Sequence, residues 1–435
     1  MSVRTSGGLS KRLIRGGVLL ALVVAAAAFA VRPSDLELLP SGERARIERN
    51  FFGLHIHRAE SEANWPSVFF GSWRLWDAYV TWARLQPARG EWDFSKLDHH
   101  VERAGRAGID VLMPLGMTPQ WASARPDEWS AYGPGQAAEP ASLDDWRRYV
   151  STVASRYKGR IQTYELWNEV TEKMFWSGTP ERMVELACAA KEVLSAIDPS
   201  IRLVAPSGTG IDRRLGWIRT FLDAGGARCV DVLSYHLYLG PNPPEHMVRD
   251  LLKLRADLKA AGYDKLPLWN TESGYWFTST VDRTAQKWSA DERRYAIDDA
   301  TAAAFMPRMM LLERALGFER HYWYAWDNDK MGLIDTQTRS KKPIADVYER
   351  LATLLLRSSL DACTREGDRF WRCDLTMADG RPAVAVWVGG AAGASMAFSS
   401  PWNAQVTRFD TGRLDSVKQG ESLQIDGNVR LFIKN

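Results

Sequence analysis

An alternation of short apolar runs with amphipathic helical segments predicts an α/β protein, a closed (β/α)8 TIM barrel, and a change of pattern near residue 360 predicts a small C-terminal antiparallel β domain. The apolar runs are spread over roughly 300 residues, which suits such a barrel with insertions. An open doubly wound sheet would instead need a glycine-rich turn after its first strand, and Gly53 alone does not supply one. The eight predicted strands are 51–57, 72–76, 109–115, 162–168, 201–206, 230–236, 266–271 and 321–326.

The segments between these strands carry signals for where helices begin. Ser142, Thr179 and Ser289 each stand at an N-cap position, and proline follows Thr179 at the first helical position. The last helix is predicted at about 343–357, again with proline first. The segment between the first two strands is too short for a full-length helix. Most strands are thus followed by a helix, as the barrel requires.

After residue 360 the helical period disappears. The runs that follow alternate or are β-branched, and turn dipeptides such as Gly389-Gly390 separate them. The strands predicted there are 369–375, 382–388, 394–400, 405–410 and 422–433. We therefore divide the chain into a signal peptide or membrane anchor at 1–30, a linker at 31–50, a barrel at 51–358 and a β-sandwich-like domain at 359–435.

The first thirty residues resemble an export signal. They hold four of the 56 basic residues and none of the 53 acidic ones, so the rest of the chain is nearly neutral and does not suggest nucleic-acid binding. The apolar run 18–31 ends in small residues around an Ala-x-Ala cleavage site at 28–30. We expect an exported protein, periplasmic or extracellular, that is either cleaved or anchored to the inner membrane through residues 18–31.

The four cysteines are compatible with an oxidising compartment. Cys363 and Cys373 could bridge neighbouring strands, whereas Cys188 lies in a helical apolar stripe and Cys229 just before a strand. The sequence contains no CxxC motif and no Cys/His spacing typical of a metal site.

Two carboxylates stand at the ends of predicted strands. Glu169 ends the fourth strand in "TYELWNEV", and Glu272 ends the seventh in "PLWNTESGYW". Residues at the carboxyl ends of barrel strands line one mouth, so these acids can meet only across it. A facing carboxylate pair is typical of glycoside hydrolysis, in which one acid protonates the leaving oxygen and the other stabilises or attacks the anomeric carbon. Ion pairing with arginines at strand ends is the structural alternative.

Several of these stretches also resemble a known group of enzymes. "YELWNE" resembles the fourth-strand motif of clan A glycoside hydrolases, and Glu272 matches the seventh-strand nucleophile of that clan. "SWRLWD", "HLY" and "YAWDN" are similar to motifs after the second, sixth and eighth strands, and "TPQWAS" with "RLWDAYVTWARLQPARGEWDFSKLD" narrows the likeness to family 39. The nearest in character are bacterial members encoded with exopolysaccharide synthesis genes. One departure is Val170, where many clan members have proline, which leaves the shape of that loop open.

This resemblance implies an enzyme that retains anomeric configuration, acts on a polysaccharide or oligosaccharide and needs no cofactor or metal. Glu169 would be the acid/base, protonated at the start of the cycle, and Glu272 the nucleophile. Glu165, which shares the strand parity of Glu169, is expected to be a buried ion-pair partner of Arg74. The predicted substrate-binding residues are His57, Arg74, Trp121, Asn168, His236, Tyr238, Trp276 and Trp326. Within this set, Asn168 is assigned to the sugar 2-OH, Arg74 and Tyr238 to the orientation of Glu272, and Trp326 to a platform under the sugar.

Two other functions remain open at this point. His55 and His57 face the same way on the first strand, as metal-binding pairs do in barrel amidohydrolases, and His236 and Asp327 could complete that site. A non-catalytic carbohydrate-binding barrel is the second alternative. The tryptophan-rich loops favour an open groove and an endo-acting exopolysaccharide hydrolase, whereas the sugar and the oligomeric state cannot be inferred from the sequence.

Overall fold

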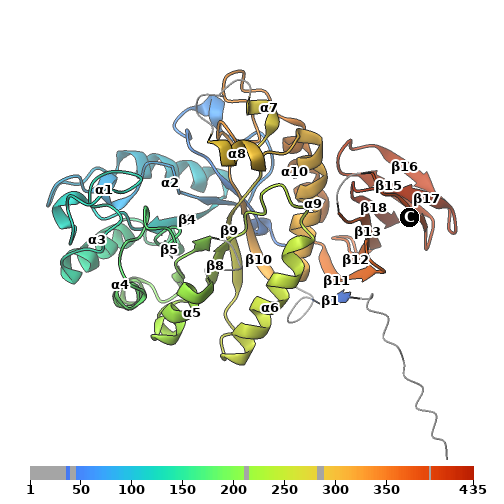
Figure 1. Ribbon diagram of the computed structural model, residues 1–435. Helices are drawn as coiled ribbons and strands as arrows, with labels where there is room; N and C mark the ends of the chain where they lie inside the picture. Colours follow the sequence, from blue (N-terminus) through green and yellow to red (C-terminus); the bar gives the residue numbers. More distant parts are fainter. Residues whose placement is uncertain (1–35, 40–45, 210–214, 282–288, 391–392) are drawn as a thin grey trace, which may run out of the picture.

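The computed structural model describes residues 36–39, 46–209, 215–281, 289–390 and 393–435 (Figure 1). The predicted leader at 1–30 and the apolar run at 18–31 lie outside these residues. Within the described part of the chain, no helix is both long and apolar enough to cross a bilayer.

A curled parallel sheet forms the centre of the molecule and confirms the predicted barrel. In the described residues it has nine strands in the order β6-β5-β4-β3-β2-β10-β9-β8-β7. β6 and β7 are two halves of the fifth barrel strand: β6 pairs with β5, β7 pairs with β8, and a Val204–Val232 bridge joins the two edges. The strands are β2 (Phe52–His55), β3 (Ser72–Arg74), β4 (Asp110–Leu115), β5 (Thr163–Leu166), β6 (Arg202–Val204), β7 (Gly208–Thr209), β8 (Leu233–His236), β9 (Leu268–Ser273) and β10 (Phe318–Trp323).

Helices surround this sheet and begin where the capping signals predict. The side chains of Ser142, Thr179 and Ser289 each accept a hydrogen bond from the third backbone N–H of their helix. The segment after β2 has only the short 3-10 helix η2 (Glu62–Asn64), as its length predicts. The helices are α1 (Trp82–Leu85), α2 (Ser95–Ala107), α3 (Leu143–Arg156), α4 (Pro180–Ile197), α5 (Leu215–Asp223), α6 (His246–Ala260), α7 (Thr278–Val281), α8 (Ala290–Tyr295), α9 (Asp299–Ala315) and α10 (Pro343–Leu355), with 3-10 turns η1 (Arg49–Phe51), η3 (Gln120–Ala122) and η4 (Gly226–Cys229).

Side chains fill the barrel below its mouth. An apolar cluster gathers one or two residues from several strands, and Gly53 is required there because a Cβ would collide with the Tyr322 ring. This cluster consists of Leu112, Val204, Val232, Trp269 and Tyr322. The lower barrel is therefore packed core, and reactive side chains can meet a substrate only at the carboxyl ends of the strands.

The C-terminal domain is an antiparallel sheet that continues the chain directly from α10. In the described residues its large sheet has seven strands in the order β1-β11-β12-β13-β18-β15-β16, and β14 and β17 form a second, two-stranded sheet. Its strands are β11 (Ser359–Glu366), β12 (Phe370–Thr376), β13 (Pro382–Val388), β14 (Met396–Ser399), β15 (Ala404–Arg408), β16 (Leu414–Val417), β17 (Ser422–Ile425) and β18 (Arg430–Lys434). Strands β11 and β16 and the break between β17 and β18 were not predicted, because polar residues interrupt the alternation in all three places.

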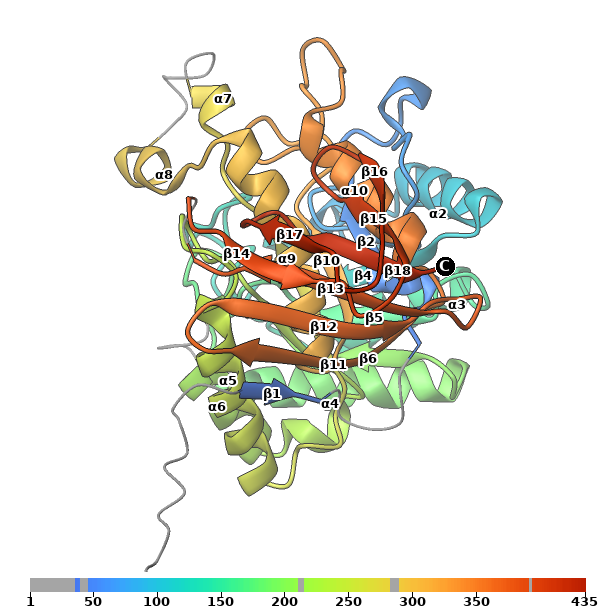
Figure 2. The ribbon, with the colours of Figure 1, turned by 90° about the vertical axis from the view of Figure 1, so that its right-hand side faces the viewer.

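The segment predicted as a linker at 31–50 contains a β-strand. Residues Leu36–Leu38 form strand β1, which pairs antiparallel with β11 at the edge of the large sheet. Leu38 is buried there, so an apolar side chain in a polar stretch explains the strand. Figures 1 and 2 both place β1 beside β11, at the end of the molecule opposite α7 and α8.

Two disulfides cross-link the chain. Cys363 and Cys373 are directly opposite residues of β11 and β12, which confirms the predicted bridge. Cys188 of α4 and Cys229 of η4 form the second disulfide. The sequence alone did not indicate this pairing, because the two cysteines meet only when the helix after the fourth strand packs beside the segment before the sixth.

Candidate active site

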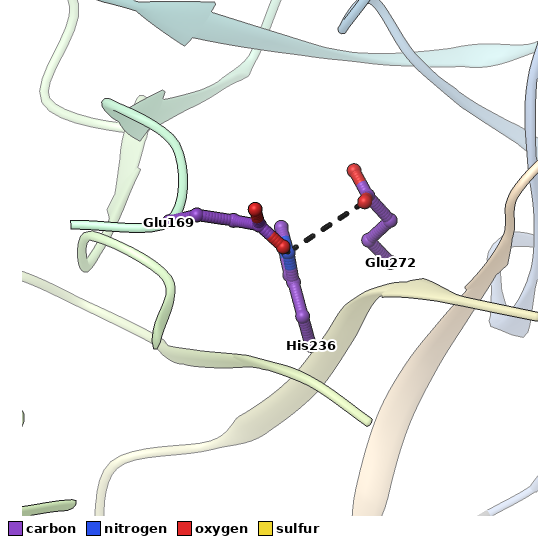
Figure 3. A group of neighbouring side chains, drawn as sticks. All are labelled: Glu169, His236 and Glu272. Carbon is purple, nitrogen blue, oxygen red and sulfur yellow. Dashed lines mark hydrogen bonds and ion pairs between the residues drawn. The ribbon is translucent and has the colours of Figure 1, made fainter. Parts of the chain in front are cut away.

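Residues from the ends of six strands, β2, β3, β5, β8, β9 and β10, meet at the mouth of the barrel. Glu169 follows β5, His236 ends β8 and Glu272 lies in β9, and a carboxylate oxygen of each acid and a ring nitrogen of His236 all lie within 4.8 Å of one another (Figure 3). The two acids are therefore brought together across the mouth, as their positions at strand ends predict.

Glu272 is held by donors on both of its oxygens. Arg74 Nη1 donates to Oε2 at 2.9 Å, and the Tyr238 hydroxyl donates to Oε1 at 2.8 Å. The pKa of Glu272 is raised to about 7, because burial, aided by the nearby charge of Glu169, outweighs the lowering effects of His236, Arg74 and the Tyr238 hydrogen bond. Of the two acids, Glu272 thus has fixed partners that favour its ionised form once a proton has left the pair.

Arg74 connects Glu272 to two residues of the fourth-strand motif. Its Nε donates to Glu165 Oε2 at 2.5 Å and its Nη2 donates to Asn168 Oδ1 at 2.8 Å. Arg74 and Glu165 are fully buried, so the predicted ion pair between them is confirmed. Because the Asn168 carbonyl oxygen accepts from Arg74, the orientation of the amide is set and its NH2 group remains the side available to a ligand.

Glu169 lies in a loop with unusual backbone angles. Trp167 and Glu169 have φ of 56° and 43°, in the left-handed region that is costly for residues with a Cβ. The Glu169 N–H donates to Ser207 Oγ at 3.3 Å, and the Val170 N–H donates to Ser207 O at 3.0 Å. Proline at 170 could not make the second bond. The backbone N–H of Val170 therefore ties this loop to the segment between β6 and β7.

His236 lies between the two carboxylates. Its Nδ1 is 3.0 Å from Glu169 Oε1 and 3.8 Å from Glu272 Oε1. Burial lowers the pKa of His236 to about 4, so the ring is neutral near pH 7. A neutral imidazole accepts a hydrogen bond from a protonated carboxyl in one tautomer and donates a hydrogen bond to a carboxylate in the other. His236 can therefore bond Glu169 in both protonation states.

The rings of His57, Trp276 and Tyr324 line the mouth next to the carboxylates. Tyr238 stacks on Trp276 with ring centroids 5.9 Å apart, and His57 packs on Tyr324 at 5.0 Å. His57, Trp276 and Tyr324 all line a pocket of about 330 Å³. The predicted positions of His57 and Trp276 at the mouth are thus consistent with the structure.

The other two predicted tryptophans lie elsewhere. The Trp121 indole N–H donates to Gln86 O at 2.9 Å and Arg89 covers its ring, so Trp121 packs beside α1. Trp326 is 3% exposed and belongs to the main hydrophobic core. The aromatic side chain that follows β10 at the mouth is Tyr324, two residues earlier, and the platform assigned to Trp326 is therefore wrong.

A second set of residues at the mouth was not predicted. Asp77 accepts hydrogen bonds from the Tyr132 hydroxyl at 2.5 Å and from the Tyr324 hydroxyl at 2.6 Å. These residues and Trp76 line a pocket of about 200 Å³, which shares His57, Tyr324 and Asn328 with the larger pocket. The one signal in the sequence was the position of Asp77, the last residue of "SWRLWD" after the second strand.

Two residues of the alternative metal site, His55 and Asp327, form hydrogen bonds with backbone groups. His55 is fully buried and its Nε2 donates to Thr271 O at 3.0 Å. Asp327 accepts from the backbone N–H groups of His57 and Arg58 at 2.7 and 2.9 Å, so both its oxygens hold the loop after β2. The group with metal-ligand spacing in the described residues is instead Glu169, His236 and Glu272. A cation there would lie beside the Arg74 guanidinium, which opposes its binding.

Comparisons with known proteins find glycoside hydrolases. A family model described as beta-galactosidase, of the Glyco_hydro_42 type, matches residues 74–174, a range that includes Arg74, Asn168 and Glu169. The beta-xylosidase of Geobacillus stearothermophilus is 24% identical over 207 residues, which are 42% of this chain and 40% of the relative. The matched region thus spans less than half the length of that curated relative.

Solved structures share the whole architecture. A family 39 glycoside hydrolase from Bacteroides cellulosilyticus WH2 superposes with a TM-score of 0.71 at 18% identity, covering 89% of this chain and 81% of that one. A family 39 beta-xylosidase from Caulobacter crescentus gives 0.61 at 17% identity, covering 91% and 99%. At these identities the likeness establishes the fold, a barrel followed by a β domain. Together with the sequence matches, it supports the resemblance to clan A glycoside hydrolases of the family 39 type.

Proposed function

We propose that the protein is a retaining glycoside hydrolase that cleaves the O-glycosidic bonds of a polysaccharide by double displacement. The observation that carries this proposal is the pair Glu169 and Glu272, whose carboxylate oxygens approach within 4.8 Å across the mouth. Retaining enzymes hold their carboxyl groups about 5–5.5 Å apart, and inverting enzymes about 6.5–9.5 Å apart to leave room for a water. The short separation favours direct attack by one carboxylate.

In the first step, a Glu272 oxygen attacks the anomeric carbon while the bond to the leaving oxygen breaks and Glu169 gives that oxygen its proton. Arg74 and Tyr238 donate to Glu272 and favour its carboxylate form. Since two like charges at this distance disfavour double ionisation, the pair readily retains one proton, which this assignment places on Glu169. The Asn168 amide, fixed by Arg74, is positioned to donate to the sugar 2-OH.

In the second step, Glu169 takes a proton from water as the water attacks the anomeric carbon and the bond to Glu272 breaks. His236 supports both halves of this cycle because its neutral ring, 3.0 Å from Glu169, can accept a hydrogen bond from the protonated acid in one tautomer and donate one to the carboxylate in the other, without itself gaining a charge. Tyr324, held by Asp77, takes the place of Trp326 as the aromatic neighbour of the reacting sugar.

We further propose that the substrate is a long chain, an exopolysaccharide cut at internal bonds. Two pockets share His57, Tyr324 and Asn328, and Trp276 of the larger one stacks on Tyr238, which donates to Glu272. The hollow beside Glu272 thus extends over more than one pocket. Exposed aromatic side chains continue it: Tyr79 and Tyr132 line the smaller pocket, and Trp129, 69% exposed, lies three residues before Tyr132. Such flat exposed rings suit stacking against sugar faces.

We also propose that the protein acts outside the cytoplasm. The resemblance of residues 1–30 to an export signal and the two disulfides support a protein that acts outside the cytoplasm, where such bonds persist. N-terminal sequencing and cell fractionation test it. A cytoplasmic protein with Met1 intact would contradict it.

Product analysis tests the reaction. The enzyme is incubated with a panel of bacterial exopolysaccharides and xylans, and products are followed by size and by proton NMR of the newly formed reducing end. We expect a ladder of oligosaccharides whose anomeric configuration is at first retained. Release of single sugars only would contradict the endo mode, and inversion would contradict the role of Glu272.

A further inference from the structure

Glu245 joins the barrel to the β domain through one carboxylate. Its Oε1 accepts from Arg308 Nε at 2.8 Å and from Trp387 Nε1 at 2.7 Å, and its Oε2 accepts from Arg308 Nη2 and from Gly390 N at 3.4 Å. Arg308 belongs to α9 of the barrel and its side chain is 1% exposed, whereas Trp387 lies in β13, one residue before the strand ends. Barrel and β domain thus share the same buried ion pair.

The β domain is shaped to reach this carboxylate. The turn after β13 is Gly389-Gly390, and a Cβ on Gly389 would lie 3.2 Å from the Glu245 carboxyl carbon and 2.9 Å from the Trp371 ring. The backbone carbonyls of Gly390 and Gly427 accept from Arg308 at 3.2 and 3.5 Å. Two turns of the β domain therefore converge on the Glu245–Arg308 pair.

The other end of the same loop carries a residue of the candidate active site. Glu245 closes the segment 237–245, in which prolines at 241, 243 and 244 fix φ and stiffen the backbone. At its start, the Leu237 N–H donates to Glu272 O at 3.2 Å and the Tyr238 hydroxyl donates to Glu272 Oε1 at 2.8 Å. A short, stiff connection thus runs from the β domain to Glu272.

We propose that Glu245 is a positioning residue, through which the β domain holds the loop 237–245 and so maintains the hydrogen bond from Tyr238 to Glu272. The catalytic consequence rests on the proposed function, whereas the mechanical link does not. Four groups face the Glu272 carboxylate: Arg74, Tyr238, His236 and Glu169. Of these, Tyr238 alone lies on the loop that Glu245 ends.

The test uses Trp387→Phe, which removes the N–H bonded to Glu245 and leaves the Glu245–Arg308 pair in place. We expect the acid limb of the kcat/KM profile to move to higher pH by about half a unit, since a weakened hydrogen bond from Tyr238 favours protonated Glu272.

A double mutant tests whether this shift passes through Tyr238. In a Tyr238→Phe background, Trp387→Phe should cause no further shift, because the bond is already absent. The conservative variant Glu245→Asp keeps the negative charge but, being one methylene shorter, draws the carboxylate back from both Trp387 and Arg308, and it should reproduce the shift.

The matched control is Arg350→Gln. Arg350 of α10 also joins barrel to β domain, by donating to the carbonyls of Phe409 and Asp410, but its helix carries no residue of the site. It should lower the melting temperature without moving the acid limb. Equal shifts in both variants, or an additive shift in the Tyr238→Phe background, would show that Trp387 acts through general stability and would overturn the proposal.

A readout independent of activity separates this proposal from the enzymatic one. Amide hydrogen exchange in residues 237–245 should become several-fold faster in Trp387→Phe and in Glu245→Asp, and stay unchanged in Arg350→Gln. Unchanged exchange in the first two variants would refute the mechanical link. If the wild-type protein hydrolysed no glycoside, the proposed function would fail while the exchange experiment would still decide the role of Glu245.

Discussion

The two acids at the mouth are held by very different parts of the chain. Glu272 lies within strand β9, its side chain is 8% exposed, and Arg74 and Tyr238 each donate to one of its oxygens. Glu169 lies in a loop after β5 at φ 43°, and its side chain is 14% exposed. A nucleophile must meet one carbon atom at one position, which a strand and two fixed donors ensure, whereas an acid/base must serve a leaving group and then a water.

The same contrast appears in how each environment is stabilised. The Glu272 side is a connected network of buried charges, in which Arg74 bonds Glu165, Asn168 and Glu272. The Glu169 side depends on backbone bonds to Ser207 and on the imidazole of His236. Substitutions on the two sides should therefore fail in different ways.

The largest effects should come from the acids themselves. Glu272→Ala should abolish glycosyl-enzyme formation, because it removes the attacking oxygen. Glu169→Ala should keep the first step on aryl glycosides with good leaving groups and lose about 10²–10⁴ in rate on poorly activated ones. Intermediate trapping by mass spectrometry and steady-state kinetics on both substrate types measure this.

Azide gives the control for these assignments. It needs no general base, so it should restore turnover of Glu169→Ala with a glycosyl azide of retained configuration, and of Glu272→Ala with an inverted one. The opposite pair of configurations would mean that the roles of Glu169 and Glu272 are reversed.

Removing the shared anchor should affect stability as well as activity. Arg74→Met leaves Glu165 and Glu272 buried without their cation, and breaking such a network costs about 3–5 kcal/mol of unfolding free energy. Urea denaturation near pH 8 measures this loss of unfolding free energy. Arg89→Met, which removes an exposed partner of Asp145, serves as the control and should change stability far less. Similar losses for both would contradict the buried network as a source of stability.

Val170→Pro should damage only the Glu169 side. It removes the bond from the Val170 N–H to Ser207 O and, because a residue before proline favours an extended backbone, it opposes φ 43° at Glu169. We expect a loss of about 10²-fold on poorly activated glycosides, the lower end of the range for acid/base help. Glycosyl-enzyme formation from activated substrates is the internal control; its equal loss would show that the whole site is disturbed.

The smallest expected effect is a shift in pH dependence. Burial raises the pKa of Glu272 to about 7, so kcat/KM of the wild-type enzyme should fall as pH drops through 7. Tyr238→Phe removes a donor to the carboxylate, which raises this pKa further and should move the acid limb upward by about one unit. Profiles recorded with an activated glycoside test it. A shift to lower pH would contradict the role of the Tyr238 hydroxyl.

Strand order was sufficient to predict which residues meet. The barrel brings the ends of β3, β5, β8 and β9 to one mouth, so Glu169 and Glu272 could be grouped from their positions at strand ends, whereas Arg74 and His236 were added through the resemblance to clan A motifs. Residues inside strands were predictable for the same reason: strand parity placed Glu165 below Glu169, where it pairs with Arg74.

The positions and contacts of residues in the loops beyond the strand ends could not be predicted from strand order. The chain turns sharply after β10, which leaves Tyr324 at the mouth and Trp326 in the core, although either fits an aromatic platform by type. The partnership of Asp77 with Tyr132 and Tyr324 joins loops 55 and 247 residues apart in the sequence. Such contacts depend on loop dihedral angles, which apolar periodicity does not encode.

Strand β1 sets the direction from which the chain enters the molecule. It lies on the edge of the β domain, at the end opposite α8, whose Glu292 lines the larger pocket (Figures 1 and 2). A leader retained in a bilayer would therefore hold the protein by its far end, with the mouth facing away from the lipid. If the proposed function holds, a long polysaccharide approaching from outside would reach this pocket without first meeting the lipid, so that tethering would restrict where the protein works without hindering entry of its substrate.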